Sequence, residues 1–328
     1  MEIKKLLRTK LGFFPTPLYE LKKLSDYLNG PRIYIKRDDL TGLAFGGNKT
    51  RKLEFLLADA IASGCDSVIT GGAEQSNHCR QTAAAAAISG LECHLVLGGE
   101  EPSLPQGNYL IDKLLGAHIH WTGEFRKGEK IPEINDHLRD FGKKPYVIPY
   151  GGSNPIGVYG FIEAMNELKK QMDEIKIQFD HIVFASSSGG THSGIILGNE
   201  IYQVGSNLIG IEIDKAEDEG PYIDRLLKLL NLSSEFCGCK KIFTKEDIVL
   251  RKEYLGDGYG VVGDLERDAI QLLAGKEGIL IDPVYTGRAF GGLIDMIEKK
   301  EFSENENVLF WHSGGTPSLF TNYNLLGN

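Results

Sequence analysis

The sequence has 328 residues, of which 41% are hydrophobic and 25% charged, and its formal net charge is −9. These values are typical of a globular protein of about two domains with a sizeable core. A negative net charge without a dense run of Lys and Arg argues against nucleic-acid binding. No stretch reaches the roughly 18 apolar residues of a membrane span, and the first residues lack the apolar core of a signal peptide. We therefore expect a soluble cytoplasmic protein that does not bind membranes.

The five cysteines are spread along the chain and do not outline a disulfide framework. Cys237 and Cys239 form the only close pair, and neither a second pair nor a nearby histidine accompanies them. A zinc site there is therefore not expected. We predict five reduced thiols and no bound metal.

Short β-rich runs alternate with helix-length segments along nearly the whole chain, a pattern that favours an α/β fold with mainly parallel sheets. The predicted strands are 33–37, 67–72, 93–98, 118–121, 146–151, 181–186, 208–213, 278–283 and 308–313. Nine strands are many for one sheet, so two open sheets with a cleft between them are expected. Ligands of such sheets bind beyond the carboxyl ends of the strands.

The segment 46–54, GGNKTRKLE, follows the predicted strand 33–37 and opens a helical pattern that runs up to Gly64. It places Lys49 on a glycine turn at the start of a helix. A lysine in such a junction can lose solvent, which lowers its pKa and allows it to form a Schiff base with an aldehyde. Lys49 is thus a candidate for covalent catalysis.

Two other interpretations of this segment stay open at this point. Residues 42–50, GLAFGGNKT, nearly match the phosphate-binding pattern of nucleotide-binding proteins, which would indicate a kinase-like phosphotransferase. Asn48 interrupts that pattern and would displace the lysine amine. Lys49 could also be an ordinary solvated surface charge.

The loop 70–78 lies between the predicted strand 67–72 and an alanine-rich helix that ends near Gly90. Ser76 or Asn77 should stand at the N-terminus of that helix. Free backbone N–H groups and the positive end of the helix dipole can hold a carboxylate there. The alternative is an ordinary helix cap.

The loop 186–194, SSSGGTHSG, follows the predicted strand 181–186. Small and hydroxyl-bearing residues at a helix N-terminus form a nest for a phosphate. The dinucleotide spacing G-x-G-x-x-G is absent, and only Glu212 or Asp214 lies at the distance where a ribose-binding acid would stand. A phosphate site without a nucleotide is therefore favoured over a simple tight turn.

Polar residues also follow two late apolar runs, at 282–287 (DPVYTG) and 312–316 (HSGGT). They should emerge at the same cleft. Tyr285 taken alone could be a core tyrosine with a solvated hydroxyl. A lysine for an aldehyde, a phosphate nest, a carboxylate-binding helix end and a late hydroxyl together meet the needs of pyridoxal 5′-phosphate acting on an amino acid.

Over nearly its full length the chain also resembles the fold-type-II pyridoxal-phosphate enzymes. Within them it is similar to the 1-aminocyclopropane-1-carboxylate deaminase and D-cysteine desulfhydrase group. The segments that carry the resemblance are 14–18, 35–39, 46–54, 75–78, 282–287 and 312–317. It implies a tryptophan synthase β-like architecture of two open, mainly parallel sheet domains with the cofactor in the cleft between them.

The resemblance also implies roles for individual residues. Lys49 is similar to the Schiff-base lysine, Lys52 to a residue that assists the phosphate, and Asn77 to the residue that hydrogen-bonds the cofactor's ring hydroxyl. The residues that correspond to the phosphate cup are Ser188, Gly189, Gly190 and Thr191. The residues that correspond to the substrate-carboxylate loop are Gln75, Ser76 and Asn77. Tyr259 and Tyr285 match the paired tyrosines near the reacting carbons.

One departure discriminates within the group. The cyclopropane deaminases carry a glutamate after the DPVY tyrosine, where this chain has Thr286, which we place beside the substrate. A glutamate would keep the cofactor's pyridine nitrogen protonated, whereas Ser313 can offer it only a neutral hydroxyl. The weaker electron sink favours prompt loss of a β leaving group, so ring opening should be poor.

The activity implied is α,β-elimination of D-cysteine to pyruvate, hydrogen sulfide and ammonia. Lys49 is the natural base for the α proton, with Ser76 or a tyrosine as the alternative. L-Cysteate sulfo-lyase and 1-aminocyclopropane-1-carboxylate deaminase activities remain open, as does a non-enzymatic protein that binds the cofactor for sensing or storage.

The resemblance further implies a homodimer of two-domain subunits. The large cofactor-binding domain would comprise residues 1–52 and 160–328, and the small mobile domain residues 53–159. Closure of the small domain through the loop at Ser76 would exclude water from the reaction.

Overall fold

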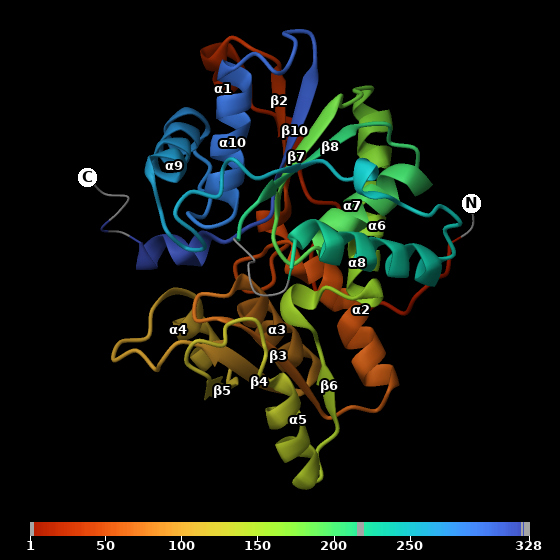
Figure 1. The fold of residues 1–328 in the computed structure, drawn as a ribbon, viewed down its shortest axis with the longest axis vertical. Coiled ribbons are helices and arrows are strands. Elements are labelled where there is room, and N and C mark those ends of the chain that lie inside the picture. Colours follow the sequence, from red (N-terminus) through yellow and green to blue (C-terminus); the bar gives the residue numbers. More distant parts are fainter. Residues whose placement is uncertain (1–2, 215–219, 323, 325–328) are drawn as a thin grey trace.

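The structure is a computed structural model that describes residues 3–214, 220–322 and 324. These residues form two separate β-sheets, a larger one in the upper half of Figure 1 and a smaller one in the lower half. Helices pack on both sheets, which confirms the predicted α/β architecture with two mainly parallel sheets.

The larger sheet has six strands in the order β1-β2-β10-β7-β8-β9. Their bounds are Leu18–Glu20 (β1), Arg32–Arg37 (β2), Asn307–His312 (β10), His181–Ser186 (β7), Asn207–Glu212 (β8) and Leu250–Arg251 (β9). Only β1 pairs in the antiparallel sense. Strand β10, from the end of the chain, lies directly beside β2, with Val308 opposite Ile33 and His312 opposite Arg37.

Both faces of the larger sheet are buried, because successive side chains of a strand point to opposite faces. In β10, Val308 and Phe310 pack into one apolar cluster, and Leu309 and Trp311 pack into another. The helices on the first face are α1 (Lys22–Leu28), α9 (Asp264–Glu277) and α10 (Thr286–Glu298). The helices toward the second face are α6 (Pro155–Ile175), α7 (Gly190–Ile201) and α8 (Tyr222–Cys237).

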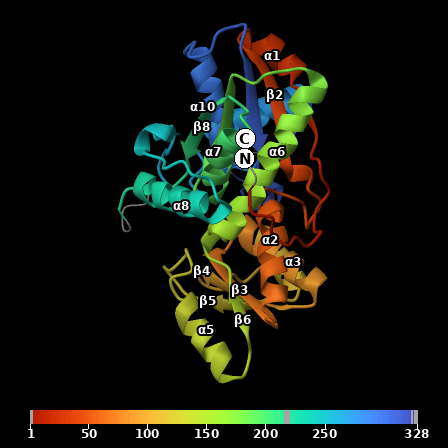
Figure 2. The same ribbon diagram turned by 90° about the vertical axis from the view of Figure 1, so that its right-hand side faces the viewer.

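The smaller sheet has four parallel strands in the order β5-β4-β3-β6. Their bounds are His118–Trp121 (β5), Glu92–Gly98 (β4), Ser67–Ala73 (β3) and Pro145–Val147 (β6). The helices that surround it are α2 (Lys49–Ala62), α3 (Asn77–Ser89), α4 (Gly107–Leu114) and α5 (Ile131–Asp140). Helix α5 covers one face of this sheet, and in the side view α2 lies between the two sheets (Figure 2).

One predicted strand is wrong. Residues 278–283 follow α9 without forming a strand. Ile279 and Ile281 are buried there while Leu280 is half exposed, so the alternation that suggested a strand is real. The carbonyl of Leu280 accepts a hydrogen bond from His312 Nε2 at 3.0 Å instead of joining a ladder of strand hydrogen bonds. The edges of the larger sheet are formed by the short strands β1 and β9, which the sequence pattern did not indicate.

The predicted domain boundaries, after Lys52 and after Tyr159, fall inside α2 and α6, the two helices through which the chain passes between the sheets. No helix in the described part of the chain is both long and apolar enough to cross a membrane. The five cysteines are all free, as predicted. Among the described residues, no group of His, Cys, Asp or Glu side chains is arranged to hold a metal ion.

Candidate active site

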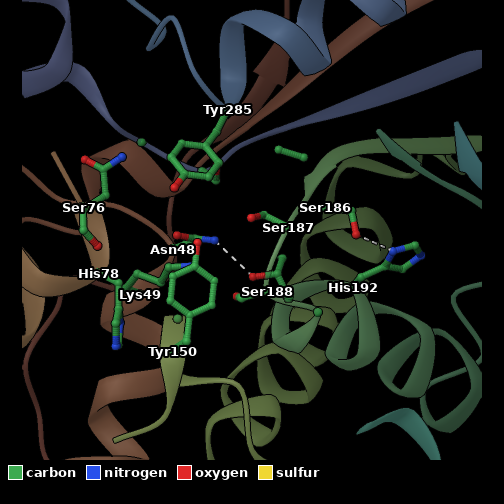
Figure 3. Close-up of a pocket in the computed structure, with 17 residues that line it drawn as sticks. Asn48, Lys49, Ser76, His78, Tyr150, Ser186, Ser187, Ser188, His192 and Tyr285 are labelled. Carbon is green, nitrogen blue, oxygen red and sulfur yellow. Dashed lines mark hydrogen bonds between the residues drawn. The ribbon is translucent and has the colours of Figure 1, made fainter. Parts of the chain in front are cut away.

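A cavity of about 600 Å³, counting the space open to solvent, lies between the two sheets. Its lining comes from the N-termini of α2 and α3 and from the segments that follow β7 and β10 (Figure 3). It therefore lies at the carboxyl ends of parallel strands, as expected for sheets of this kind. The predicted site residues that line it are Lys49, Ser76, Asn77, Ser188, Gly189, Thr191, Tyr285 and Ser313.

Lys49 is the first residue of α2 and projects into this cavity. The preceding turn requires glycine, because Gly46 has φ +67° and a Cβ there would lie 1.9 Å from the carbonyl oxygen of Asp39. The backbone N–H of Asn48 donates to the carbonyl of Ser313 at 2.9 Å, which ties the turn to the end of β10. Burial lowers the pKa of the Lys49 amine to about 8, as the sequence interpretation anticipated.

Asn48, which interrupts the nucleotide-binding pattern, has a defined place in the cavity wall. Its side-chain nitrogen donates to Thr191 Oγ1 at 3.1 Å, so it joins the turn before α2 to the start of α7. Asn48, the residue that weakened the match to a nucleotide-binding loop, thus connects the segment that carries Lys49 with the segment of the predicted phosphate cup.

A buried network of charges anchors the first turn of α2, two residues after Lys49. The Arg51 guanidinium donates to Asp38 at 2.7 Å and to Glu167 at 2.9 Å, and the Lys36 ammonium also pairs with Glu167. Burial alone would raise the pKa of Glu167, but Arg51 and Lys36 lower it to about 2. The network connects β2, α2 and α6 and fixes the helix that carries Lys49.

The predicted phosphate cup lies at the start of α7. Gly189 precedes the helix with φ +90°, and the first N–H groups of an α-helix have no partner within the helix. A Cβ on Gly190 would lie 2.7 Å from both Lys52 Nζ and Ser153 Oγ, so only glycine leaves this approach open. Lys52 is buried beside the cup, where its amine donates to the carbonyl of Gly151 at 3.0 Å.

The opposite wall begins at α3. Ser76 caps this helix, since its Oγ accepts a hydrogen bond from the backbone N–H of Cys79 at 3.2 Å, and both Ser76 and Asn77 line the cavity. Gln75 does not line it. Its Oε1 accepts from the backbone N–H of Asn108 at 2.8 Å, and the side chain faces a neighbouring hollow that Tyr259 also lines.

Tyr259 and Tyr285 form the expected pair, with their hydroxyl oxygens 2.6 Å apart. Tyr285 lines the cavity, and Tyr259 lies behind it. Burial raises the pKa of Tyr259 to about 12, although Tyr285 and Arg126 oppose this, and burial raises the pKa of Tyr285 further. Both hydroxyls are therefore protonated at neutral pH and can donate hydrogen bonds.

Arg126 joins the two halves of the molecule beside this pair. Its guanidinium lies 4.5 Å from the centre of the Tyr259 ring and donates to both carboxylate oxygens of Asp214, at 2.9 and 3.0 Å. Arg126 follows β5 of the smaller sheet, and Asp214 follows β8 of the larger one. The contact closes the outer side of the cleft over Tyr259.

The structure does not bring Thr286 into the cavity. It is fully buried, and its hydroxyl donates to Asp282 at 2.6 Å. The same carboxylate accepts from the backbone N–H groups of Val284, Tyr285 and Thr286. Thr286 therefore stabilises the turn that presents Tyr285, whereas Ser313 lines the cavity as expected.

The lining also contains residues to which the sequence analysis gave no individual role, among them Tyr150, His78, Ser186, Ser187 and His192. All but Tyr150 belong to the loops 70–78 and 186–194. Tyr150 points into the cavity from the side opposite Tyr285 (Figure 3). It follows β6, so the rule that polar residues after strands reach the cleft would have found it. His78 gave no such signal, because it lies inside a helix, where its Nε2 is 2.9 Å from Thr70 Oγ1.

The residues fit the cofactor that the sequence resemblance implies. Pyridoxal 5′-phosphate needs an amine of lowered pKa for its aldehyde, a nest for its phosphate and polar groups for its ring. Lys49 could supply the amine, the start of α7 with Lys52 beside it could supply the nest, and Asn77 and Ser313 could supply side-chain donors on the cavity wall.

The comparison with known proteins agrees with this geometry. A family model described as pyridoxal-phosphate dependent enzyme matches residues 9–314. The chain is 42% identical over 319 residues to a D-cysteine desulfhydrase of Salmonella schwarzengrund and 43% identical over 319 residues to one of Klebsiella pneumoniae. Each alignment covers 95% of this chain and 95% of the relative.

Solved structures show the same architecture. A crystal structure described as an ACC deaminase homologue matches with a TM-score of 0.90 and 38% identity, covering 98% of this chain and 96% of the other. Threonine deaminase isoform 2 of Solanum lycopersicum matches with a TM-score of 0.66 at 18% identity, covering 95% of this chain and 82% of the other, which shows a shared fold. The chain therefore belongs to the fold-type-II family of pyridoxal-phosphate-dependent enzymes.

Proposed function

We propose that this enzyme catalyses α,β-elimination of D-cysteine to pyruvate, hydrogen sulfide and ammonia. The proposal is supported by the D-cysteine desulfhydrases to which the chain is similar over 95% of its length. The observation that carries it is the chemistry of the wall around Ser313. Ser313 would offer the pyridine nitrogen a neutral hydroxyl. By the resemblance, the cyclopropane deaminases have a glutamate at the position of Thr286, which here is buried and donates to Asp282.

The chain's own residues divide the task of holding the cofactor. Lys49 would hold the aldehyde carbon, and the start of α7, from Ser188 to Thr191, would hold the phosphate. Lys52 would donate to it, because its amine lies beside the cup and is held by the carbonyl of Gly151. Asn77 would donate to the ring hydroxyl. Bound in this way, pyridoxal 5′-phosphate supplies an electron sink for the pair released when the α proton leaves.

Lys49 would take the α proton once the substrate amine has displaced it. The lowered pKa supports this role, because a base works best when its pKa lies near the working pH. Ser76 and Asn77 at the start of α3 would hold the substrate carboxylate, since the free N–H groups and dipole of a helix N-terminus attract an anion.

The tyrosine pair would protonate the departing sulfur. Tyr285 reaches the cavity, its hydroxyl lies 2.6 Å from that of Tyr259, and both keep their protons at neutral pH. A proton given by Tyr285 can be replaced along this short hydrogen bond. Sulfide then leaves as a neutral or singly charged species rather than as a dianion.

The lining also favours a thiol over a sulfonate. Lys49 is the only lysine or arginine among the described residues that line the cavity. A sulfonate is a permanent anion and would need a positively charged or strongly donating pocket. L-Cysteate is therefore the second candidate substrate, and 1-aminocyclopropane-1-carboxylate the third. Family membership argues against a kinase-like phosphotransferase.

We also propose the division into a large domain, residues 1–52 and 160–328, and a small mobile domain, residues 53–159. The support is that each sheet is continuous within one of these parts. Closure would bring the loop at Ser76 toward the cofactor. The homodimer and the cytoplasmic location stay predictions from the resemblance and the composition.

The test is a side-by-side assay of pyruvate from D-cysteine, L-cysteate and 1-aminocyclopropane-1-carboxylate with the purified yellow enzyme. Sulfide and pyruvate from D-cysteine should be the main products. The Lys49→Ala variant should lose both this activity and the visible band near roughly 410 to 420 nm that a lysine-bound cofactor gives.

Other results would change the proposal. Faster release of sulfite from L-cysteate would replace the substrate. Turnover of the cyclopropane would overturn the electron-sink argument from Ser313. A yellow enzyme without activity on any of the three would support a sensing or storage protein.

A further inference from the structure

The side-chain amide of Asn77 can face the cavity in two ways, and only one of them suits its proposed role. With its nitrogen toward the cofactor it donates a hydrogen bond to the ring hydroxyl, and with its oxygen toward the cofactor it can only accept one. Something in the protein must therefore select the orientation. The contacts of the far side of this amide show how.

Two donors converge on the side-chain oxygen of Asn77. Arg80 Nη1 donates to Asn77 Oδ1 at 2.7 Å, and Asn108 Nδ2 donates to the same oxygen at 3.0 Å. A guanidinium can only donate, so the atom of Asn77 that faces it must be the oxygen. Within the described part of the chain, Asn77 Nδ2 has no protein acceptor. The amide nitrogen is left free on the cavity side.

Arg80 is itself held without freedom to turn. It is fully buried one turn into α3, and its guanidinium also donates to Asn108 Oδ1 at 2.6 Å and to the carbonyl of Gly46 at 2.7 Å. Gly46 belongs to the turn that precedes Lys49, so the guanidinium spans the two loops that would meet at the cofactor. Although burial lowers the pKa of Arg80 to about 10, it stays charged at neutral pH.

Asn108 cannot flip either. Its Nδ2 donates to the carbonyl of Gln75 at 2.7 Å as well as to Asn77, and its Oδ1 accepts from Arg80. Exchanging the oxygen and nitrogen of Asn108 would place two donors face to face at Arg80. The orientation of each amide in this group is thus fixed by a neighbour that can act in one sense only.

We propose that Arg80 is a positioning residue, which together with Asn108 holds the amide nitrogen of Asn77 toward the ring hydroxyl of the cofactor. The inference rests on the proposed role of Asn77. Arg80 and Asn108 touch neither cofactor nor substrate in this arrangement. They act through Asn77 alone.

The arrangement has a spectroscopic consequence. A donor that faces the ring hydroxyl favours its ionised form and so lowers its pKa. If the amide of Asn77 rotates or loses its fixed orientation, this donor is lost. The pKa of the ionisation that changes the bound cofactor's visible band then rises. A hydrogen bond to a charged group corresponds to a change of roughly one to two pKa units.

The experiment is a pH titration of the visible absorbance of the holoenzyme without substrate. Arg80→Met should raise the pKa of the band by about one unit. Asn108→Asp, which keeps the shape and the acceptor but removes one donor, should raise it by less. Thr82→Val is the matched control, because Thr82 is buried on the same helix and bonds only to the carbonyl of His78. Its spectrum should equal that of the wild type.

A double-variant cycle separates positioning from a general loss of structure. Asn77→Ala alone should raise the pKa of the band, and adding Arg80→Met to it should cause no further change. Additive shifts, or a folded Arg80→Met holoenzyme with an unchanged titration, would overturn the proposal. Should Arg80→Met fail to fold, the nearly isosteric Asn108→Asp in the same cycle decides the question. Because no substrate is used, the result is independent of whether D-cysteine is turned over.

Discussion

The two walls of the cavity are built in different ways. The large-sheet wall, at the end of β7 and after β10, consists mainly of small residues, which are 186–189, 191, 313 and 314. The small-sheet wall, formed by residues 76–78 with Arg80 and Asn108 behind them, depends on a network of side chains. One wall depends on the small size of its side chains and the other on the mutual orientation of its side chains.

This difference determines what each wall tolerates. The large-sheet wall should be disrupted when a larger side chain is introduced, because that side chain fills the space for the ligand. The small-sheet wall should be disrupted when one donor or acceptor is replaced, even by a residue of equal size, because the remaining groups lose the hydrogen bond that orients them. Substitutions on the two walls should therefore differ in kind, and the following predictions are ordered from the largest expected effect to the smallest.

Tyr259→Phe tests whether the tyrosine pair acts as a unit behind the large-sheet wall. Loss of its hydroxyl leaves Tyr285 without the partner 2.6 Å away, and we expect kcat to fall by a factor on the order of 10² to 10⁴, the range of general acid catalysis. Steady-state kinetics on D-cysteine measure this. Tyr202→Phe removes a hydroxyl bonded to Glu163 outside the cavity and should leave kcat unchanged. A kcat within threefold of the wild type would assign the acid to another group.

Glu167→Gln tests the anchor of α2, on which both walls depend. Because the pKa of Glu167 is lowered from an ordinary 4.5 to about 2 in the folded protein, its contribution to stability is present above about pH 4.5. That contribution is lost as the pH falls toward 2. The difference in unfolding free energy between wild type and variant should thus shrink on acidification, by an amount on the order of 3 kcal/mol. Urea unfolding between pH 6 and 3 should show the trend, and a constant difference would contradict it.

Gly190→Ala tests the large-sheet wall at the start of α7. The added Cβ would lie 2.7 Å from Lys52 Nζ and Ser153 Oγ, so the cup must deform. We expect the cofactor to bind about 10 to 100 times more weakly, as if one or two hydrogen bonds to a charged group were lost. Fluorescence titration of the apoenzyme measures this affinity. Gly275→Ala is the control, because nothing lies near a Cβ at that position. Equal affinities for the two variants would remove the argument for a cup.

Ser76→Ala tests the small-sheet wall at its helix cap. Removing the acceptor for the N–H of Cys79 should cost about 1 kcal/mol of stability and raise KM for D-cysteine, with little change in kcat. Thermal melting and steady-state kinetics together measure both effects. Thr244→Ala removes a cap outside the cavity and should lower stability alone. A Ser76→Ala variant that loses kcat rather than KM would point to proton transfer by Ser76.

The sequence was informative about the loops that line the cavity and much less about the side chains behind them. Glycine turns and loops that follow strands are local features, so the turn before Lys49, the loop 186–194 and a helix start at Ser76 or Asn77 could be located from the chain itself. Arg80 and Asn108 could not, because they lie 28 positions apart and meet only in the folded protein. A buried arginine inside an alanine-rich helix carries no local sign of its partners.

Two other differences have the same origin. Residues 278–283 have the alternation of a strand, but a strand also needs a neighbour with free hydrogen-bonding groups, and a sequence pattern does not report neighbours. Thr286 follows a site tyrosine in the chain, yet its hydroxyl turns to Asp282 because the turn before α10 needs an internal cap. Adjacency in sequence did not become adjacency in the cavity.

The pairing of β2 with β10 bears on how the enzyme is made. Strand β2 leaves the ribosome early, and its neighbour at Asn307–His312 follows only after some 270 further residues. The larger sheet thus cannot close during most of translation, whereas the smaller sheet can form from a continuous stretch of nascent chain. The turn before Lys49 donates a hydrogen bond to this later segment, from the backbone N–H of Asn48 to the carbonyl of Ser313. The turn that carries the reactive amine therefore cannot reach its final hydrogen bonding until residues 307–313 have been made.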